Sequence, residues 1–173
     1  GGNLSLLSAG TGLSLSVPAN FSVSDASFQI KKLNKDTALG AIGTPADYQA
    51  VGDFVYDLHS IPYSQTAITS FNQPVQVSVN YNTSDASGLS ENTFKIYRYD
   101  DSIWSQLSGC SVDTFSRSVT CTTSNFSTFS LFGQTATTVS VTEDSNDQTP
   151  AITPVGNGPP LFVSQTATQS DAS

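Results

Sequence analysis

The chain has 173 residues and is poor in charge: Lys and Arg together number 6, Asp and Glu number 14, and the formal net charge at pH 7 is −8. This acidic balance argues against a nucleic-acid partner and against docking on an anionic membrane. No apolar run approaches the ~20 residues that a membrane-spanning helix needs, and no signal segment opens the chain. A chain that starts Gly1-Gly2 is expected to be processed or excerpted.

Short segments in which apolar and polar residues alternate follow one another along the chain, as is typical of half-buried β-strands. In chain order they cover residues 13–17, 28–30, 54–58, 75–81 and 94–98. Turn-forming residues separate them at 40–45, 84–88 and 100–102. No amphipathic helix is expected. The pattern predicts an all-β fold, an antiparallel β-sandwich.

Four short motifs occur in an informative order. A Gly-Gly segment at 1–6 precedes a Gly-Leu-Ser-Leu-Ser-Val-Pro strand within 12–19. Phe-Asn-Gln-Pro-Val at 71–75 and Phe-Lys-Ile-Tyr-Arg at 94–98 follow. This succession resembles the ZU-type β-sandwich of ankyrins, netrin receptors and many microbial surface proteins.

The segment from Trp104 to Phe129 holds the only tryptophan and both cysteines. Cys110 and Cys121 flank alternating segments that would face each other across a β-hairpin, so we expect a disulfide that staples the hairpin. A buried reduced pair is the alternative. A bridge would fit an oxidising compartment and would stabilise the fold by about 3 kcal/mol through loop closure.

The same segment resembles the proteolysis-site motif that ends the autoproteolysis-inducing domains of adhesion receptors and polycystin-like proteins. The resemblance makes Ser127 the nucleophile and the Phe126 carbonyl its target. The family's basic histidine is Asn125 here, and an amide has no usable basicity near neutral pH. We therefore expect a strand-terminal turn at Asn125, Phe126 and Ser127, with Phe126 and Phe129 in the core. Cleavage between Phe126 and Ser127 is the alternative.

Serine, threonine, asparagine and glycine replace the missing charge, which is common in secreted and surface-displayed β-proteins. With the expected disulfide, this predicts an extracellular or cell-surface location. Four Asn-x-Ser/Thr sequons are candidate N-glycosylation sites in a source that has this pathway. They are Asn3, Asn20, Asn82 and Asn125.

No metal or cofactor site is expected. His59 is the only histidine and is expected to be a surface strand residue; it would act as a base for Ser127 only if the fold brought the two together. Acidic clusters at 100–101 and 143–147 lack the spaced ligands of a calcium loop and are expected to be solvated turns. The only basic cluster, expected in a solvent-facing loop, consists of Lys31, Lys32 and Lys35.

The aromatic residues supply one more candidate site. Tyr97 and Tyr99 share a strand face with Lys95, so these tyrosines are expected to face solvent. Exposed rings on a sandwich face can stack on sugars, which makes a carbohydrate-binding module an alternative function. Packing and cross-strand pairing are the preferred interpretation, particularly for Trp104.

We expect a β-sandwich domain over residues 1–133 and an extended tail or linker over 134–173. The tail is rich in Ser and Thr and has four prolines, so little apolar surface offsets a chain entropy of about 1–2 kcal/mol per residue. Two patches, 137–142 and 160–164, still have strand-like patterns. Each is suited to adding to a sheet edge, in its own chain or in a neighbouring copy.

Together these features predict a non-enzymatic structural or adhesion module of a larger extracellular surface or filament-forming protein. Its expected partners are neighbouring copies or modules of the same protein, with glycans as the alternative. Assembly would proceed by β-strand addition.

Overall fold

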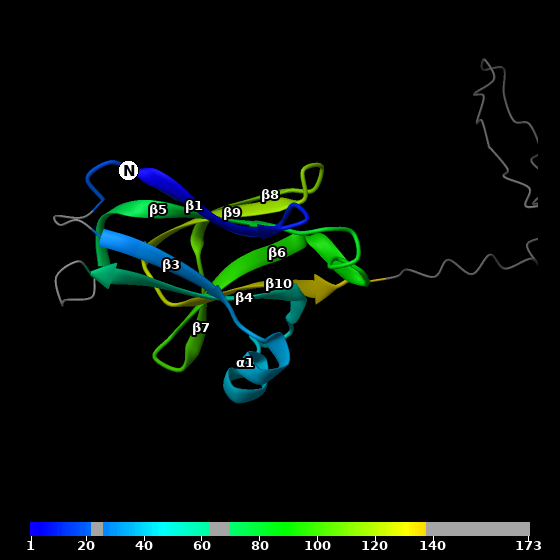
Figure 1. Cartoon of the computed structure of the whole chain (residues 1–173). Helices are drawn as coiled ribbons and strands as arrows, with labels where there is room; N and C mark the ends of the chain where they lie inside the picture. Colours follow the sequence, from blue (N-terminus) through cyan, green and yellow to red (C-terminus); the bar gives the residue numbers. More distant parts are fainter. Residues whose placement is uncertain (22–25, 63–69, 138–173) are drawn as a thin grey trace, which may run out of the picture. The chain divides into compact units, whose positions relative to one another are not determined.

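The protein is a sandwich of two antiparallel β-sheets, seen in a computed structural model that describes residues 1–21, 26–62 and 70–137 (Figure 1). The first sheet has the order β1-β2-β5-β9-β8. Its strands are β1 Gly2–Ser8, β2 Thr11–Val17, β5 Ser70–Asn80, β9 Ser118–Asn125 and β8 Ser108–Asp113. The second sheet has the order β3-β4-β10-β6-β7. Its strands are β3 Ala26–Lys32, β4 Gln49–Pro62, β10 Thr128–Thr135, β6 Leu89–Asp100 and β7 Ile103–Gln106.

The predicted fold class is confirmed, since both sheets are antiparallel and pack on each other. The last strand, β10, ends at Thr135. From residue 138 onward, the predicted tail, with its acidic cluster at 143–147 and the patch at 160–164, lies outside the described residues. In the part of the chain that is described, no helix is long and apolar enough to cross a membrane.

The main core forms because alternate residues of each strand point between the sheets. In the first sheet, Leu13 and Leu15 of β2 pair in register with Val79 and Val77 of β5, and all four are buried. Val77 pairs in turn with Cys121 of β9. Each such side chain contributes about 1.5–3 kcal/mol when it leaves water.

The second sheet is buried on both faces. Val55, Tyr97 and Phe132 are buried but lie outside the core between the sheets, because they alternate with the inward-facing residues of β4, β6 and β10. The Tyr97 ring lies 5.5 Å from Phe132 and 5.5 Å from Tyr48. Trp104 closes this outer cluster at 5.0 Å from Phe132.

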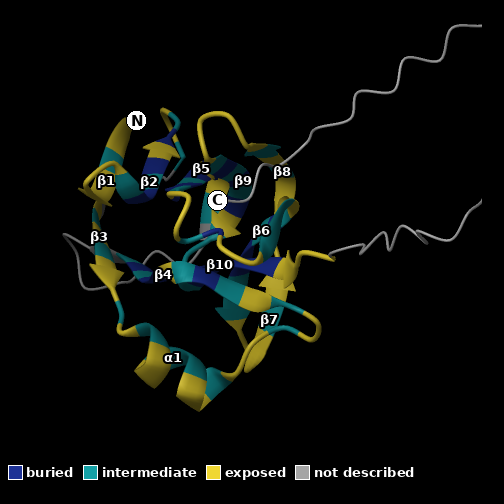
Figure 2. Cartoon of the chain, turned by 90° about the vertical axis from the view of Figure 1, so that its right-hand side faces the viewer, coloured by how far each residue is buried: buried dark blue, intermediate teal, exposed yellow. Residues whose placement is uncertain are grey.

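The loop after a short helix packs on this outer face, and the helix itself lies beside β4 (Figures 1 and 2). Helix α1, Lys35–Ile42, begins at Asn34, whose side chain accepts a 2.9 Å hydrogen bond from the Thr37 amide, and it ends at Gly43 with φ +73°. The Trp104 indole donates to the Gly43 carbonyl at 2.9 Å, which fixes the loop to β7.

Helix α1 has no apolar stripe that the sequence could show, because none of its residues is buried, and no amphipathic helix was expected. One prediction about the outer face is wrong, because that face is covered. Tyr97 was expected to face solvent, yet it is only 8% exposed. Burial and a hydrogen bond with Tyr48 raise the pKa of Tyr97 to about 12.

The basic cluster was also placed wrongly. It does not form a loop, because Lys31 and Lys32 end strand β3 and Lys35 begins α1. Lys31 and Lys32 are exposed, and the Lys35 ammonium lies 3.3 Å from the Asp53 carboxylate.

The outer cluster gives a direct stability test. Phe132→Ala is expected to lower the free energy of unfolding by about 3–5 kcal/mol, because it empties a fully buried ring site. Phe115→Ala is the matched control, since that ring is 95% exposed, and it should change stability by less than about 0.5 kcal/mol. Urea unfolding followed by circular dichroism measures both. Equal losses would contradict a packed outer layer.

Candidate functional site

The two cysteines lie on the paired strands β8 and β9 and form the predicted disulfide. Their sequence separation is 11 and their Cα atoms are 4.0 Å apart. The register between β8 and β9 shifts between Ser108 and Ser111, where Gly109 adopts φ +59°. A bulge at this glycine re-aims the chain so that Cys110 meets Cys121. The stapled hairpin is confirmed, and the reduced pair is ruled out.

The turn of this hairpin is held by one carboxylate. Asp113 Oδ1 accepts hydrogen bonds from the amides of Phe115 at 2.9 Å and Ser116 at 3.0 Å. Bonds from Ser116 and Phe115 lower the pKa of Asp113, because they favour its charged form. The hairpin is therefore fixed at both its turn and its open end.

The proteolysis-site-like segment carries the chain from one sheet to the other. Strand β9 ends at Asn125 and β10 begins at Thr128, so Phe126 and Ser127 form the link between the sheets. The buried Thr123 hydroxyl donates to the Asn125 carbonyl at 2.8 Å and accepts from the Asn125 amide at 3.3 Å. The structure thus has a short bent link at the strand end, where a strand-terminal turn was predicted.

Aromatic packing holds the link in place. The Phe126 ring lies 4.5 Å from Phe71 and 5.1 Å from Phe28, both in edge-on contacts, and Phe21 joins the same group. Phe126 is half-buried against the core, whereas Phe129 is fully buried. The prediction that both rings lie in the core is therefore confirmed for Phe129, whereas Phe126 packs against the core from the link.

The hydroxyl and the carbonyl of Ser127 bond to neighbouring strands. Its hydroxyl donates to the Tyr99 carbonyl of β6, and its own carbonyl accepts from the Leu58 amide of β4 at 3.0 Å. An amide carbonyl cannot take up the proton that a serine nucleophile must release. The hydroxyl therefore joins β6 to the link in this arrangement.

His59 lies next to the residue that bonds this link, but its side chain makes no described contact with Ser127. It follows Leu58, whose amide bonds the Ser127 carbonyl. The described ring contact of His59 is with Asp57, at 3.3 Å between Nδ1 and Oδ2, and the side chain is 43% exposed. The base expected from the family motif thus has no substitute among the described contacts of Ser127.

The four sequons fall into two environments. Three of their asparagines are exposed, namely Asn3 on β1, Asn20 after β2 and Asn82 after β5. Asn125 is half-buried at the end of β9. The Asn82 side chain accepts from the Ser84 hydroxyl at 2.6 Å and from the Asp85 amide at 3.0 Å, so it also shapes its own turn.

The candidate sugar-stacking rings form one packed group. Trp104 and Tyr99 are half-buried with ring centroids 5.2 Å apart, and Phe132 connects Trp104 to the buried Tyr97. The Tyr97 ring is therefore not exposed to solvent for stacking on a sugar, contrary to the prediction. Within the described residues, no group of three or more His, Cys, Asp or Glu side chains could hold a metal ion.

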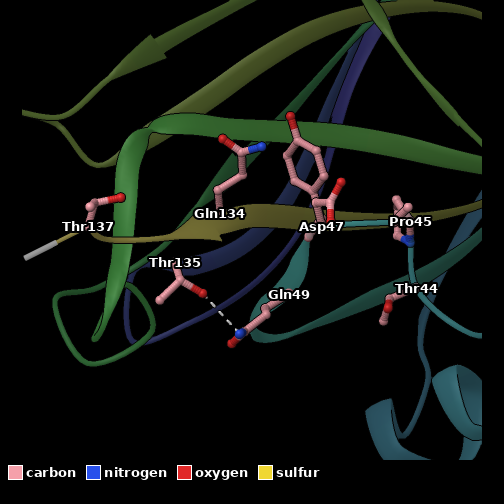
Figure 3. A pocket seen from close by; sticks show the side chains of 9 residues that line it. Thr44, Pro45, Asp47, Gln49, Gln134, Thr135 and Thr137 are labelled. Atoms are coloured by element: carbon pink, nitrogen blue, oxygen red, sulfur yellow. Dashed lines mark hydrogen bonds between the residues drawn. The ribbon is translucent and has the colours of Figure 1, made fainter.

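A polar hollow that the sequence did not reveal lies between the loop after α1 and the end of β10 (Figure 3). Its volume is about 630 Å³, and Asp47 supplies the charged group of its lining. The Gln49 side-chain amide donates to the Thr135 hydroxyl at 3.1 Å across it. No local motif marks this hollow, because its two walls are far apart in the chain.

No protein-family model matches the chain, and a search of curated proteins also finds no match. The resemblances to the ZU-type sandwich and to the proteolysis-site motif therefore stay predictions.

The role of the Ser127 hydroxyl can be measured. Ser127→Ala should lower the free energy of unfolding by about 1–2 kcal/mol, because the half-buried Tyr99 carbonyl loses its partner. Ser105→Ala on the exposed face of β7 is the control and should have no measurable effect. Chemical denaturation gives both values. A loss no larger than that of the control would show that the bond does not hold the link.

Proposed function

We propose that this chain is a non-enzymatic structural or adhesion module of a larger extracellular surface or filament-forming protein, and that it assembles through β-strand addition. The observation that carries this proposal is that both sheets are open, with edge strands β1 and β8 in one and β3 and β7 in the other. An open edge is a template for another strand. A further 36 residues, 138–173, follow the sandwich and contain strand-like patches.

The use of the Asn125 to Ser127 link supports a non-enzymatic role. The hydroxyl at the family's nucleophile position is bonded to a backbone carbonyl, and the residue at the base position is an amide. Removing a general base typically costs a factor of 10² to 10⁴ in rate. Autoproteolysis between Phe126 and Ser127 stays the enzymatic alternative.

An extracellular location is supported by the disulfide and by composition. The intramolecular bridge is compatible with an oxidising compartment, where such bonds persist. Three sequon asparagines are accessible on the surface. Carbohydrate binding stays an alternative, and the polar hollow at Gln49 and Thr135 suits a sugar better than the packed rings around Trp104.

Assembly of the full chain tests this function. Sedimentation velocity at rising protein concentration should show species larger than the 18.2 kDa chain, and the tail should become resistant to protease as they form. Electron microscopy should show polymers. A chain that stays monomeric at every concentration, with a protease-sensitive tail, would contradict the proposal.

A further inference from the structure

The four edge strands are protected to different degrees. Natural sheets guard their edges by short length, charge, proline or bulges. Strand β7 has only four residues, β8 carries a bulge and a disulfide, and β3 ends in two exposed lysines. Strand β1 has seven residues, Gly-Asn-Leu-Ser-Leu-Leu-Ser, with no charge, no proline and an unbroken register with β2. Within the described residues, β1 alone lacks every one of these devices.

The side of the sandwich at β1 also exposes apolar surface. Leu6 is 39% exposed and Leu7 is 49% exposed. Both line a hollow of about 150 Å³, whose floor includes the buried Phe54 and Tyr56 of the opposite sheet. Lys32 of β3 completes its rim. Strands β1 and β3 lie near each other on this side of the sandwich (Figures 1 and 2).

We propose that the free edge of β1 accepts residues 160–164 from a neighbouring copy of the chain as an added strand over this hollow. The proposal rests on the function proposed above and names its acceptor and its donor. Main-chain hydrogen bonds to β1 would supply affinity, and alternate side chains would supply specificity.

The donor sequence, Pro-Leu-Phe-Val-Ser, suits the edge of β1 and the apolar hollow beside it. Leu161 and Val163 share one strand face, so both can cover the apolar hollow while Phe162 points the other way. Pro160 stands at the first position of the strand, where the ladder tolerates a proline. The segment has no charged residue to desolvate.

Chain length favours this patch over the one at 137–142. The latter begins two residues after β10 ends at Thr135 and is therefore held near that end. About 25 residues separate Thr135 from Pro160, and an extended chain spans up to about 3.3 Å per residue. The donor can therefore reach an adjacent molecule.

Opposite charges favour the approach of the donor tail to the β1 side of a neighbouring copy. Residues 138–173 contain four acidic residues and no basic one. The acceptor side presents Lys31 and Lys32, which are exposed and have no ion-pair partner among the described residues. Because the whole chain has a net charge of −8, an acidic tail is repelled by most of a neighbouring copy, but these two lysines attract it. Association should therefore slow as salt rises.

A pair of full-length variants tests donor and acceptor separately. Leu7→Lys places a charge on the acceptor edge, and Val163→Asp places one on the donor. Each alone should self-associate at least tenfold more weakly than the unmodified chain in sedimentation velocity. Mixed one to one, they should form a heterodimer, because the edge-blocked copy still donates and the donor-blocked copy still accepts.

The controls separate a blocked edge from a damaged fold. Ile103→Lys charges the 64% exposed apolar residue of edge β7 and should assemble as the unmodified chain does. Ser5→Lys, at an exposed position of β1, is a second edge variant and should act like Leu7→Lys. Circular dichroism verifies that each variant is folded.

Other results overturn the assignment in recognisable ways. If Val163→Asp alone assembles normally, residues 160–164 are not the donor, and the patch at 137–142 or β1 of a second copy takes their place. If both β1 variants assemble normally, another edge is used. In these cases assembly survives and only this site is lost. If the unmodified chain never associates, the proposed function itself fails.

Discussion

The whole sandwich depends on strand β10, because both of its faces are buried. Phe129 and Leu131 pack between the sheets, and Phe132 packs into the outer cluster with Tyr97 and Trp104. A Cβ at Gly133 would lie 2.5 Å from the Phe94 ring, so only glycine allows β10 to pass this close to β6. Strands β4 and β6 pair with β10 on either side. Its position therefore sets the second sheet and the layer outside it.

The segment that resembles a proteolysis site is the support of this strand. The disulfide links β9 to β8, and the Thr123 hydroxyl bonds the backbone of Asn125 at the end of β9. The hydrogen bond from Ser127 to Tyr99 positions the start of β10 beside β6. A reactive serine must be free to release its proton and change partners. Here the same hydroxyl joins the link to β6, so structural and catalytic use of Ser127 compete.

The sequence predicted the strands and the disulfide hairpin, which depend on nearby residues. It did not predict the covered outer face or the hollow beside β1, which depend on contacts between distant parts of the chain. Alternation gives the strands, and the spacing of Cys110 and Cys121 gives the hairpin. Alternation within a strand cannot say that the outer face of the second sheet is covered, because Tyr48 and Trp104, which pack there, come from other parts of the chain. Tyr97 was therefore assigned to solvent. The hollow beside β1 needs Leu7 of one sheet and Tyr56 of the other, and only the fold brings them together.

Intact mass under denaturing conditions tests the structural role of the link most directly. The account predicts one continuous polypeptide of 18.2 kDa plus any attached glycans, lighter by two hydrogens when no reductant is present. Both cysteines precede Ser127, so a cut there would release its C-terminal piece with or without reductant. A fragment that begins at Ser127 would contradict the account.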